Sequence, residues 1–162
     1  MTVLLPPELI AAAQAVLDSH QQSGTLVACA ESCTGGLVAA ALTSIAGSSA
    51  VMARGFVTYS NQAKNEMLGV PAALIEAHGA VSAEVAVAMA RGALAHSRAD
   101  RTVAITGVAG PGGGSPDKPV GLVHFAAGRR DGAVTATARH FSGDRDQIRL
   151  RAALTALSLL MA

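Results

Sequence analysis

The fold is decided by the stretch at residues 25–45, TLVACAESCTGGLVAAALTSI. Its first part, TLVACA, has the length and apolar character of a buried strand, and its last part, LVAAALTSI, is typical of a helix. Between them lies AESCTGG, residues 30–36, whose paired glycines permit a tight turn. A strand that turns directly into a helix is the repeating unit of α/β proteins, so this stretch predicts an α/β fold.

The rest of the chain extends the same alternation of strands and helices. Further strands are predicted at 50–60, 101–110, 120–127 and 133–141, and Gly128–Gly132 is typical of a hairpin turn. Further helices are predicted at 7–22, 61–68, 71–77, 82–97 and 144–160, with Asn61, Ser82 and Asp144 as capping residues. This order predicts a three-layer α/β/α sandwich around a mixed, mostly parallel sheet of about five strands.

Composition indicates one globular domain spanning residues 1–162. Apolar residues make up 51% of the chain, aromatic residues only 2%, and the net charge is +1. No cluster of Lys and Arg is present, so a nucleic-acid partner is not expected. The start lacks the basic region of a signal peptide, and Thr43, Ser44 and the Gly47-Ser48-Ser49 turn interrupt the uncharged stretch 34–53. We therefore expect a cytoplasmic protein without a membrane segment, in which Cys29 and Cys33 are free thiols.

The turn AESCTGG has two interpretations. Ser32 or Thr34 can simply cap the following helix. Alternatively, Ser32 or Cys33 is a nucleophile, and the N–H groups of the turn (Cys33, Thr34, Gly35, Gly36) form an oxyanion hole. The pattern is not the G-x-S-x-G elbow of hydrolases, and Cys29 with Cys33 makes a poor zinc site because no second ligand pair accompanies them.

A second candidate segment is VTYSNQAK, residues 57–64. Tyr59 is the only tyrosine of the chain and Lys64 is one of two lysines. Both lie near a predicted strand end, where α/β proteins form their sites. A desolvated neutral lysine can serve as the base for a serine hydroxyl, with a tyrosine hydroxyl in the relay. The alternative is a solvated lysine and a tyrosine at the rim of the sheet.

A third candidate segment is TGVAGPGGG, residues 106–114, in which small residues expose many backbone N–H groups. Such a loop can hold a phosphate or a ribose, although it matches neither the dinucleotide fingerprint nor the P-loop. Its alternative is an ordinary flexible connection. Arg145 and Arg149, four residues apart, are candidates for binding an anionic group, or for ion pairs with Asp144 and Asp146. The five histidines are scattered and predict no metal site.

Four motifs in order resemble one known family. They are AESCTGG, GFVTYSNQAK with LGV after it, GAVSAEVAVAMARGA, and TGVAGPGGGSPDKPVGLVH. Over residues 7–160 the chain resembles the CinA C-terminal domain family, the nicotinamide-nucleotide amidohydrolases. The resemblance implies an α/β/α sandwich, a homo-oligomer, and hydrolysis of nicotinamide mononucleotide to nicotinate mononucleotide and ammonia.

The same resemblance assigns roles to individual residues. It implies that Ser32 is the nucleophile and that Lys64 and Tyr59 support it, without a metal or other cofactor. The substrate's ribose and phosphate are then expected on the loop, at Thr106, Gly107, Ala109, Gly110 and Gly112, with Arg145 beside the phosphate. The competing hypotheses are a non-catalytic nucleotide-binding module, a metal-dependent hydrolase and a competence-related interaction protein.

Overall fold

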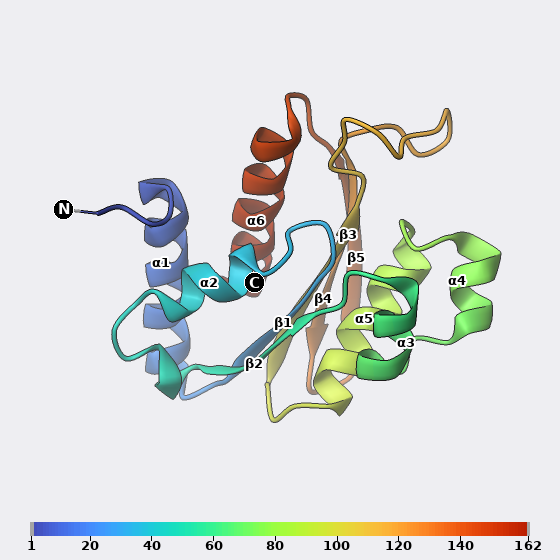
Figure 1. The fold of residues 1–162 in the computed structure, drawn as a ribbon. Coiled ribbons are helices and arrows are strands. Elements are labelled where there is room, and N and C mark those ends of the chain that lie inside the picture. The colour runs from blue at the N-terminus through green and yellow to red at the C-terminus, as the bar shows by residue number, and fades with distance from the viewer. Residues whose placement is uncertain (1, 162) are drawn as a thin grey trace.

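Five strands form a single sheet in the order β2-β1-β3-β4-β5 in the computed structural model, which describes residues 2–161 (Figure 1). The strands are β1 (Val27–Glu31), β2 (Met52–Val57), β3 (Arg101–Gly107), β4 (Leu122–Arg129) and β5 (Val134–His140). β1 pairs in parallel with β2 and β3, whereas β3–β4 and β4–β5 are antiparallel. The mixed sheet of five strands is confirmed, with one correction: parallel pairing accounts for half of the pairings, because the late hairpin adds two antiparallel ones.

Helices cover both faces of the sheet. One face carries α1 (Pro7–Ser23), α2 (Leu37–Thr43) and α6 (Arg145–Met161), and the other carries α3 (Asn61–Leu68), α4 (Ala72–His78) and α5 (Ala83–Ala95), as Figure 1 shows. A short 3₁₀ turn, η1 (Ser48–Ala50), precedes β2. The expected three-layer α/β/α sandwich is therefore confirmed. Among residues 2–161, no helix combines the length and apolarity needed to cross a membrane.

The two faces of the sheet build separate halves of the core. Cys29, Val103 and Ile105 are buried toward α1 and α6, as the alternation along a strand requires. Ala28, Ala30 and Ala104 are buried toward α5, where their small side chains allow close packing of helix on sheet. The scarcity of aromatic residues is thus a consequence of close contacts between alanine-rich surfaces.

The helix caps match the capping residues predicted from the sequence at two positions and differ at one. The Ser82 hydroxyl accepts from the N–H of Val85, and Asp144 accepts from the N–H of Gln147. For α3, however, the capping residue is Ser60 and not Asn61, because the Ser60 hydroxyl accepts from the N–H of Ala63 at 3.0 Å. Asn61 is already the first helical residue.

The parallel half of the sheet determines where a site can form. β1, β2 and β3 run in the same direction, so the segments that follow them emerge at one edge. These segments begin with Ser32, Thr58 and Val108, and they contain all three stretches that the sequence singled out. Chain direction alone therefore brings the candidate residues together.

Candidate active site

Ser32 and Lys64 meet in the interior at this edge. Ser32 begins the turn after β1 and is 8% exposed, while Lys64 projects from α3 and is 1% exposed. Lys64 Nζ lies 3.0 Å from Ser32 Oγ. Lysine is among the residues that are least often buried, so a buried lysine beside a serine hydroxyl requires a chemical explanation.

The surroundings of Lys64 favour a neutral amine. Its Nζ also donates to the backbone oxygens of Thr58 at 3.0 Å and Tyr59 at 3.3 Å, and no carboxylate of residues 2–161 forms a salt bridge with it. Burial lowers the pKa of Lys64 from its usual 10.5, and only the thiolate form of Cys33 would oppose this shift. A neutral amine has two N–H bonds for the two carbonyls, and its lone pair is then left for the proton of Ser32.

The turn after Ser32 offers backbone donors. The N–H of Ser32 donates to Ile105 O, that of Gly35 to Ser32 O, and that of Leu37 to Thr34 O. Within residues 2–161, the N–H groups of Cys33 and Thr34 have no partner on another residue. Of the four oxyanion candidates, Cys33 lines the cavity described below, whereas Thr34, Gly35 and Gly36 do not.

Cys33 is poorly suited to be the nucleophile. Burial raises the pKa of its thiol to about 11, and the nearby Glu31 carboxylate acts in the same direction. The thiolate is the reactive form of cysteine, so very little of it exists near neutral pH. Cys29 is fully buried in the core, and its pKa is raised as well, mainly by desolvation.

The sequence did not identify Glu31, which the structure places at the base of the turn. Its carboxylate is fully buried and accepts from the Thr34 hydroxyl at 2.7 Å and from the N–H groups of Val38 and Ala39, each at 3.0 Å. It therefore does what a capping side chain does for α2, and neither Ser32 nor Thr34 caps this helix. The available signal was a carboxylate at the end of an apolar strand, which requires several donors when it is buried.

Ser32 and Lys64 open into a cavity of about 330 Å³. Its other walls come from Ala80 and Val81 before α5 and from the glycine-rich loop. The predicted loop residues all line it: Thr106, Gly107, Ala109, Gly110 and Gly112. The Thr106 hydroxyl itself donates to Ala80 O at 2.8 Å and so joins two walls.

Tyr59 and Arg145 lie at the mouth of this cavity. The Tyr59 side chain is 63% exposed, and its hydroxyl accepts from Arg145 Nη2 at 3.3 Å. Arg145 Nη1 also donates to Gly110 O at 2.6 Å. Among the described residues, Arg145 forms no ion pair with Asp144 or Asp146. The main-chain oxygen of Tyr59, not its hydroxyl, is the group that contacts Lys64.

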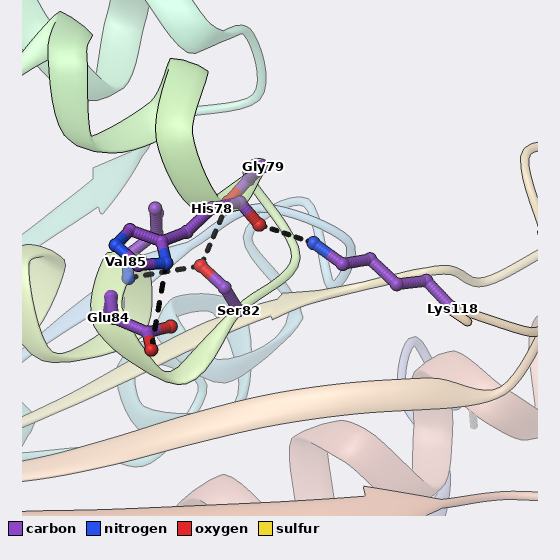
Figure 2. Close-up of polar contacts among 6 residues, drawn as sticks. All are labelled: His78, Gly79, Ser82, Glu84, Val85 and Lys118. Carbon is purple, nitrogen blue, oxygen red and sulfur yellow. Dashed lines mark hydrogen bonds and ion pairs between the residues drawn. The ribbon is translucent and has the colours of Figure 1, made fainter.

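A corner between α4 and α5 borders the cavity and holds the far end of the loop. In Figure 2, Lys118 reaches from the loop to the carbonyl oxygen of His78. The His78 ring faces Glu84 at 3.7 Å, and Ser82 connects Gly79 O to the first turn of α5. Residues 115–118 form no helix turn: the backbone N–H of Lys118 donates to the Ser115 hydroxyl, while its side chain reaches this corner.

A search for metal ligands over residues 2–161 finds no group of three or more His, Cys, Asp or Glu side chains placed to hold an ion. The chemistry that these side chains themselves offer is a serine hydroxyl next to a buried lysine, with turn N–H groups beside them. This combination, at the edge of a three-layer α/β/α sandwich, defines the kind of site: a serine–lysine pair with access to a ligand cavity.

The comparisons with known proteins identify the family. The model of the CinA C-terminal domain matches residues 10–162. The nicotinamide-nucleotide amidohydrolase PncC of Enterobacter agglomerans is 54% identical over 134 residues, which cover 83% of this chain and 82% of that protein. The crystal structure of the competence/damage inducible protein CihA from Agrobacterium tumefaciens superposes with a TM-score of 0.94 at 51% identity, over 98% of this chain and 97% of that one.

Other relatives are much longer. A CinA-like protein of Anaeromyxobacter dehalogenans is 56% identical over 137 residues, and the match covers 85% of this chain but 33% of that protein. The chain thus spans about a third of the length of the CinA-like relatives. These matches, together with the agreement in fold, place the chain in the CinA C-terminal domain family.

Proposed function

We propose that this protein hydrolyses the carboxamide of nicotinamide mononucleotide, giving nicotinate mononucleotide and ammonia, with Ser32 as nucleophile and Lys64 as base. The observation that carries the proposal is the 3.0 Å contact between Ser32 Oγ and the buried Lys64 Nζ at the wall of the cavity. The relative PncC, a nicotinamide-nucleotide amidohydrolase by name, supports the choice of reaction.

In the first half of the reaction, Ser32 Oγ attacks the carboxamide carbon while Lys64 Nζ takes its proton. The negative charge that develops on the carbonyl oxygen needs donors that are already in place. Among the turn N–H groups that have no partner on another described residue, that of Cys33 belongs to a residue lining the cavity and is our first candidate. The C–N bond then breaks, and the proton held by Lys64 passes to the leaving nitrogen, which departs as ammonia.

In the second half, water hydrolyses the acyl-serine. Lys64, neutral again, takes a proton from water as the water attacks the ester carbon, and it returns this proton to Ser32 Oγ when the ester bond breaks. The direct contact between Lys64 and Ser32 makes a relay through the Tyr59 hydroxyl unnecessary. We assign to Tyr59 the positioning of Lys64 through its backbone oxygen, and a place at the cavity mouth for its ring.

The loop and Arg145 hold the rest of the substrate in this proposal. Small residues from Gly107 to Gly112 let ribose and phosphate approach the backbone closely. Arg145 lies exposed at the mouth, where its guanidinium can bind the phosphate. The cavity volume of about 330 Å³ is at the lower end of the range of small-molecule sites.

The test is ammonia release from nicotinamide mononucleotide by the wild type and by Ser32→Ala. We expect the variant to lose about 10³-fold or more in kcat while it still binds the substrate in calorimetry. Ser158→Ala, which changes an exposed serine on α6, is the matched control and should retain wild-type activity. EDTA should leave the wild-type rate unchanged.

Other outcomes contradict parts of this proposal. A wild type that binds nicotinamide mononucleotide but releases no ammonia is a nucleotide-binding module. If Cys33→Ala abolishes the reaction and Ser32→Ala does not, the nucleophile is wrong. Loss of the wild-type rate in EDTA that zinc restores indicates a metal-dependent hydrolase.

A further inference from the structure

Arg149 binds main-chain carbonyls of the turn that carries Ser32, and not a carboxylate of the described residues. It lies on α6, partly buried, and donates from Nε to Cys33 O at 3.1 Å and from Nη2 to Thr34 O at 3.2 Å. No carboxylate pairs with it among residues 2–161. It is not part of the cavity wall, in contrast to Arg145 one turn earlier on the same helix. Its guanidinium is therefore directed entirely to two consecutive carbonyls of the turn that carries Ser32.

Holding these carbonyls fixes the N–H groups of the same peptides. In a planar trans peptide, C=O and N–H point in opposite directions. When Arg149 holds the Cys33 carbonyl, the N–H of Thr34 must point away from α6. When it holds the Thr34 carbonyl, the N–H of Gly35 points away from α6 in the same manner, and this group donates to Ser32 O at 3.0 Å.

Glu31 holds the turn from the opposite end. It accepts from the Thr34 hydroxyl and from the first N–H groups of α2, so the Thr34 side chain and the start of the helix are tied to the last residue of β1. The main chain of residues 33–34 is thus held by side chains from two elements, one of them 116 residues away in the sequence. Gly35 leaves little space here, since a Cβ at this position would lie 3.3 Å from Arg149 Nη2.

We propose that Arg149, opposed by Glu31, is a positioning residue for the oxyanion hole: by holding the carbonyls of Cys33 and Thr34 it fixes the main chain that directly follows Ser32, where Cys33 lines the cavity and its N–H has no partner on another described residue. The inference rests on the proposed function, because it assigns Arg149 to the stabilisation of the transition state in that reaction. Arg149 touches neither the substrate nor the reacting atoms, so its effect is transmitted through the turn alone.

A positioning role and a purely structural role predict different results. If Arg149 only joins α6 to the turn, its loss lowers the melting temperature and leaves the chemistry of the folded molecules unchanged. If it positions the peptide, kcat falls while KM and the pH midpoint of the rate stay the same, because the ribose and phosphate contacts and Lys64 are untouched.

The experiment compares Arg149→Met and Arg149→Lys with Arg151→Met. Arg151 is exposed on the same helix and also donates to a main-chain carbonyl, that of Ser142, outside the site. We expect Arg149→Met to lower kcat for nicotinamide mononucleotide by about 10²-fold, as for a misplacement of about 1 Å. KM should change less than about 3-fold on the same argument, and Arg151→Met should match the wild type. Arg149→Lys, which keeps the charge but not the two-pronged geometry, should also be impaired. It replaces the Met variant in the comparison if that variant does not fold.

A second measurement does not depend on the substrate. The rate at which a fluorophosphonate phosphonylates Ser32, with loss of fluoride, is followed by intact mass, because this reaction also places an anionic oxygen at the turn. Slower labelling in both Arg149 variants supports the inference even if the wild type does not hydrolyse nicotinamide mononucleotide, in which case only the proposed function fails. Wild-type kcat and labelling rates in the folded variants overturn the inference, and so does a wild type whose Ser32 is not labelled at all.

Discussion

The turn at residues 30–36 and the loop at residues 107–119 both line one cavity but are held in different ways. In the turn, two side chains hold the main chain: the fully buried carboxylate of Glu31 and the partly buried guanidinium of Arg149 on α6. In the loop, Arg145 of α6 donates to the carbonyl of Gly110, and Lys118 of the loop itself donates to the carbonyl of His78 (Figure 2); both contacts are at least partly exposed to solvent. The turn is therefore the rigid wall and the loop the adjustable one.

This difference agrees with the tasks that we propose for the two walls. A nucleophile and an oxyanion hole need positions fixed to a fraction of an ångström, and buried hydrogen bonds give such precision. A loop that admits a nucleotide and releases the product has to move. Solvent-exposed hydrogen bonds of about 1 kcal/mol each can break and re-form to allow this movement. Substitutions in the turn should therefore change kcat, and substitutions in the loop should change KM.

The largest effect is expected from Lys64→Met, which removes the base from the rigid side. We expect a loss of about 10²- to 10⁴-fold in kcat with little change in KM. The wild-type rate should rise with pH through the pKa of Lys64, which burial places below 10.5, because only the neutral amine can accept the proton of Ser32. A full pH–rate profile measures this, and the rise should be absent from whatever rate remains in the variant.

Stability should respond to pH in the same window. Because the folded state lowers the pKa of Lys64, the unfolded chain binds more protons between that pKa and 10.5, and the wild type becomes more stable as pH rises there. Urea unfolding at pH 7 and at pH 10 should therefore show that the free energy of unfolding of the wild type rises, relative to that of Lys64→Met, toward pH 10. An unchanged difference between the two proteins, together with an unaltered pH–rate profile, would remove Lys64 from the role of base.

The location of the site could be predicted from the sequence because it depends on chain direction. Ser32, Lys64 and Thr106 each follow or end a strand of the parallel half, and such strand ends gather at one edge. The pattern of apolar runs was sufficient to predict the order of elements and the layers. The prediction of a mostly parallel sheet was wrong in its proportion, since two of the four pairings are antiparallel. The reason is that apolar runs do not determine which strands become neighbours.

The contacts that hold the turn could not be predicted, for physical reasons. Arg149 meets Cys33 only after α6 has packed on the sheet, and its spacing from Arg145 suggested instead a shared anion site. Glu31 binds N–H groups seven and eight residues ahead, a range that no local capping pattern covers. The hydrogen bond from Arg145 to the Tyr59 hydroxyl likewise joins residues that lie 86 positions apart.

An intermediate effect is expected from Gly107→Ala, at the base of the loop. A Cβ there would lie 2.7 Å from Val123 Cγ2 and 2.8 Å from Leu122 O, so the end of β3 must shift. We expect a loss of about 1–3 kcal/mol in the free energy of unfolding from this overpacking. The displaced loop should raise KM about 10-fold and leave kcat within about 3-fold, since the turn is untouched. A fall in kcat without a rise in KM would contradict the division of tasks between the two walls.

The smallest effect is expected at the tip of the loop, where two neighbouring glycines differ in conformation. A Cβ at Gly112 meets no atom within 4 Å, whereas Gly113 has φ +84°, a conformation that strains any other residue. Gly112→Ala should raise the free energy of unfolding by about 0.4–1 kcal/mol, because it restricts the unfolded chain. Although Gly112 lines the cavity, the added methyl group meets no protein atom, so KM should rise less than in Gly107→Ala. Gly113→Ala, the matched control, should lower it by about 1–2 kcal/mol. Steady-state kinetics and urea unfolding of both variants measure this contrast. If Gly112→Ala instead raises KM 10-fold, the tip of the loop is as tightly fitted as the turn.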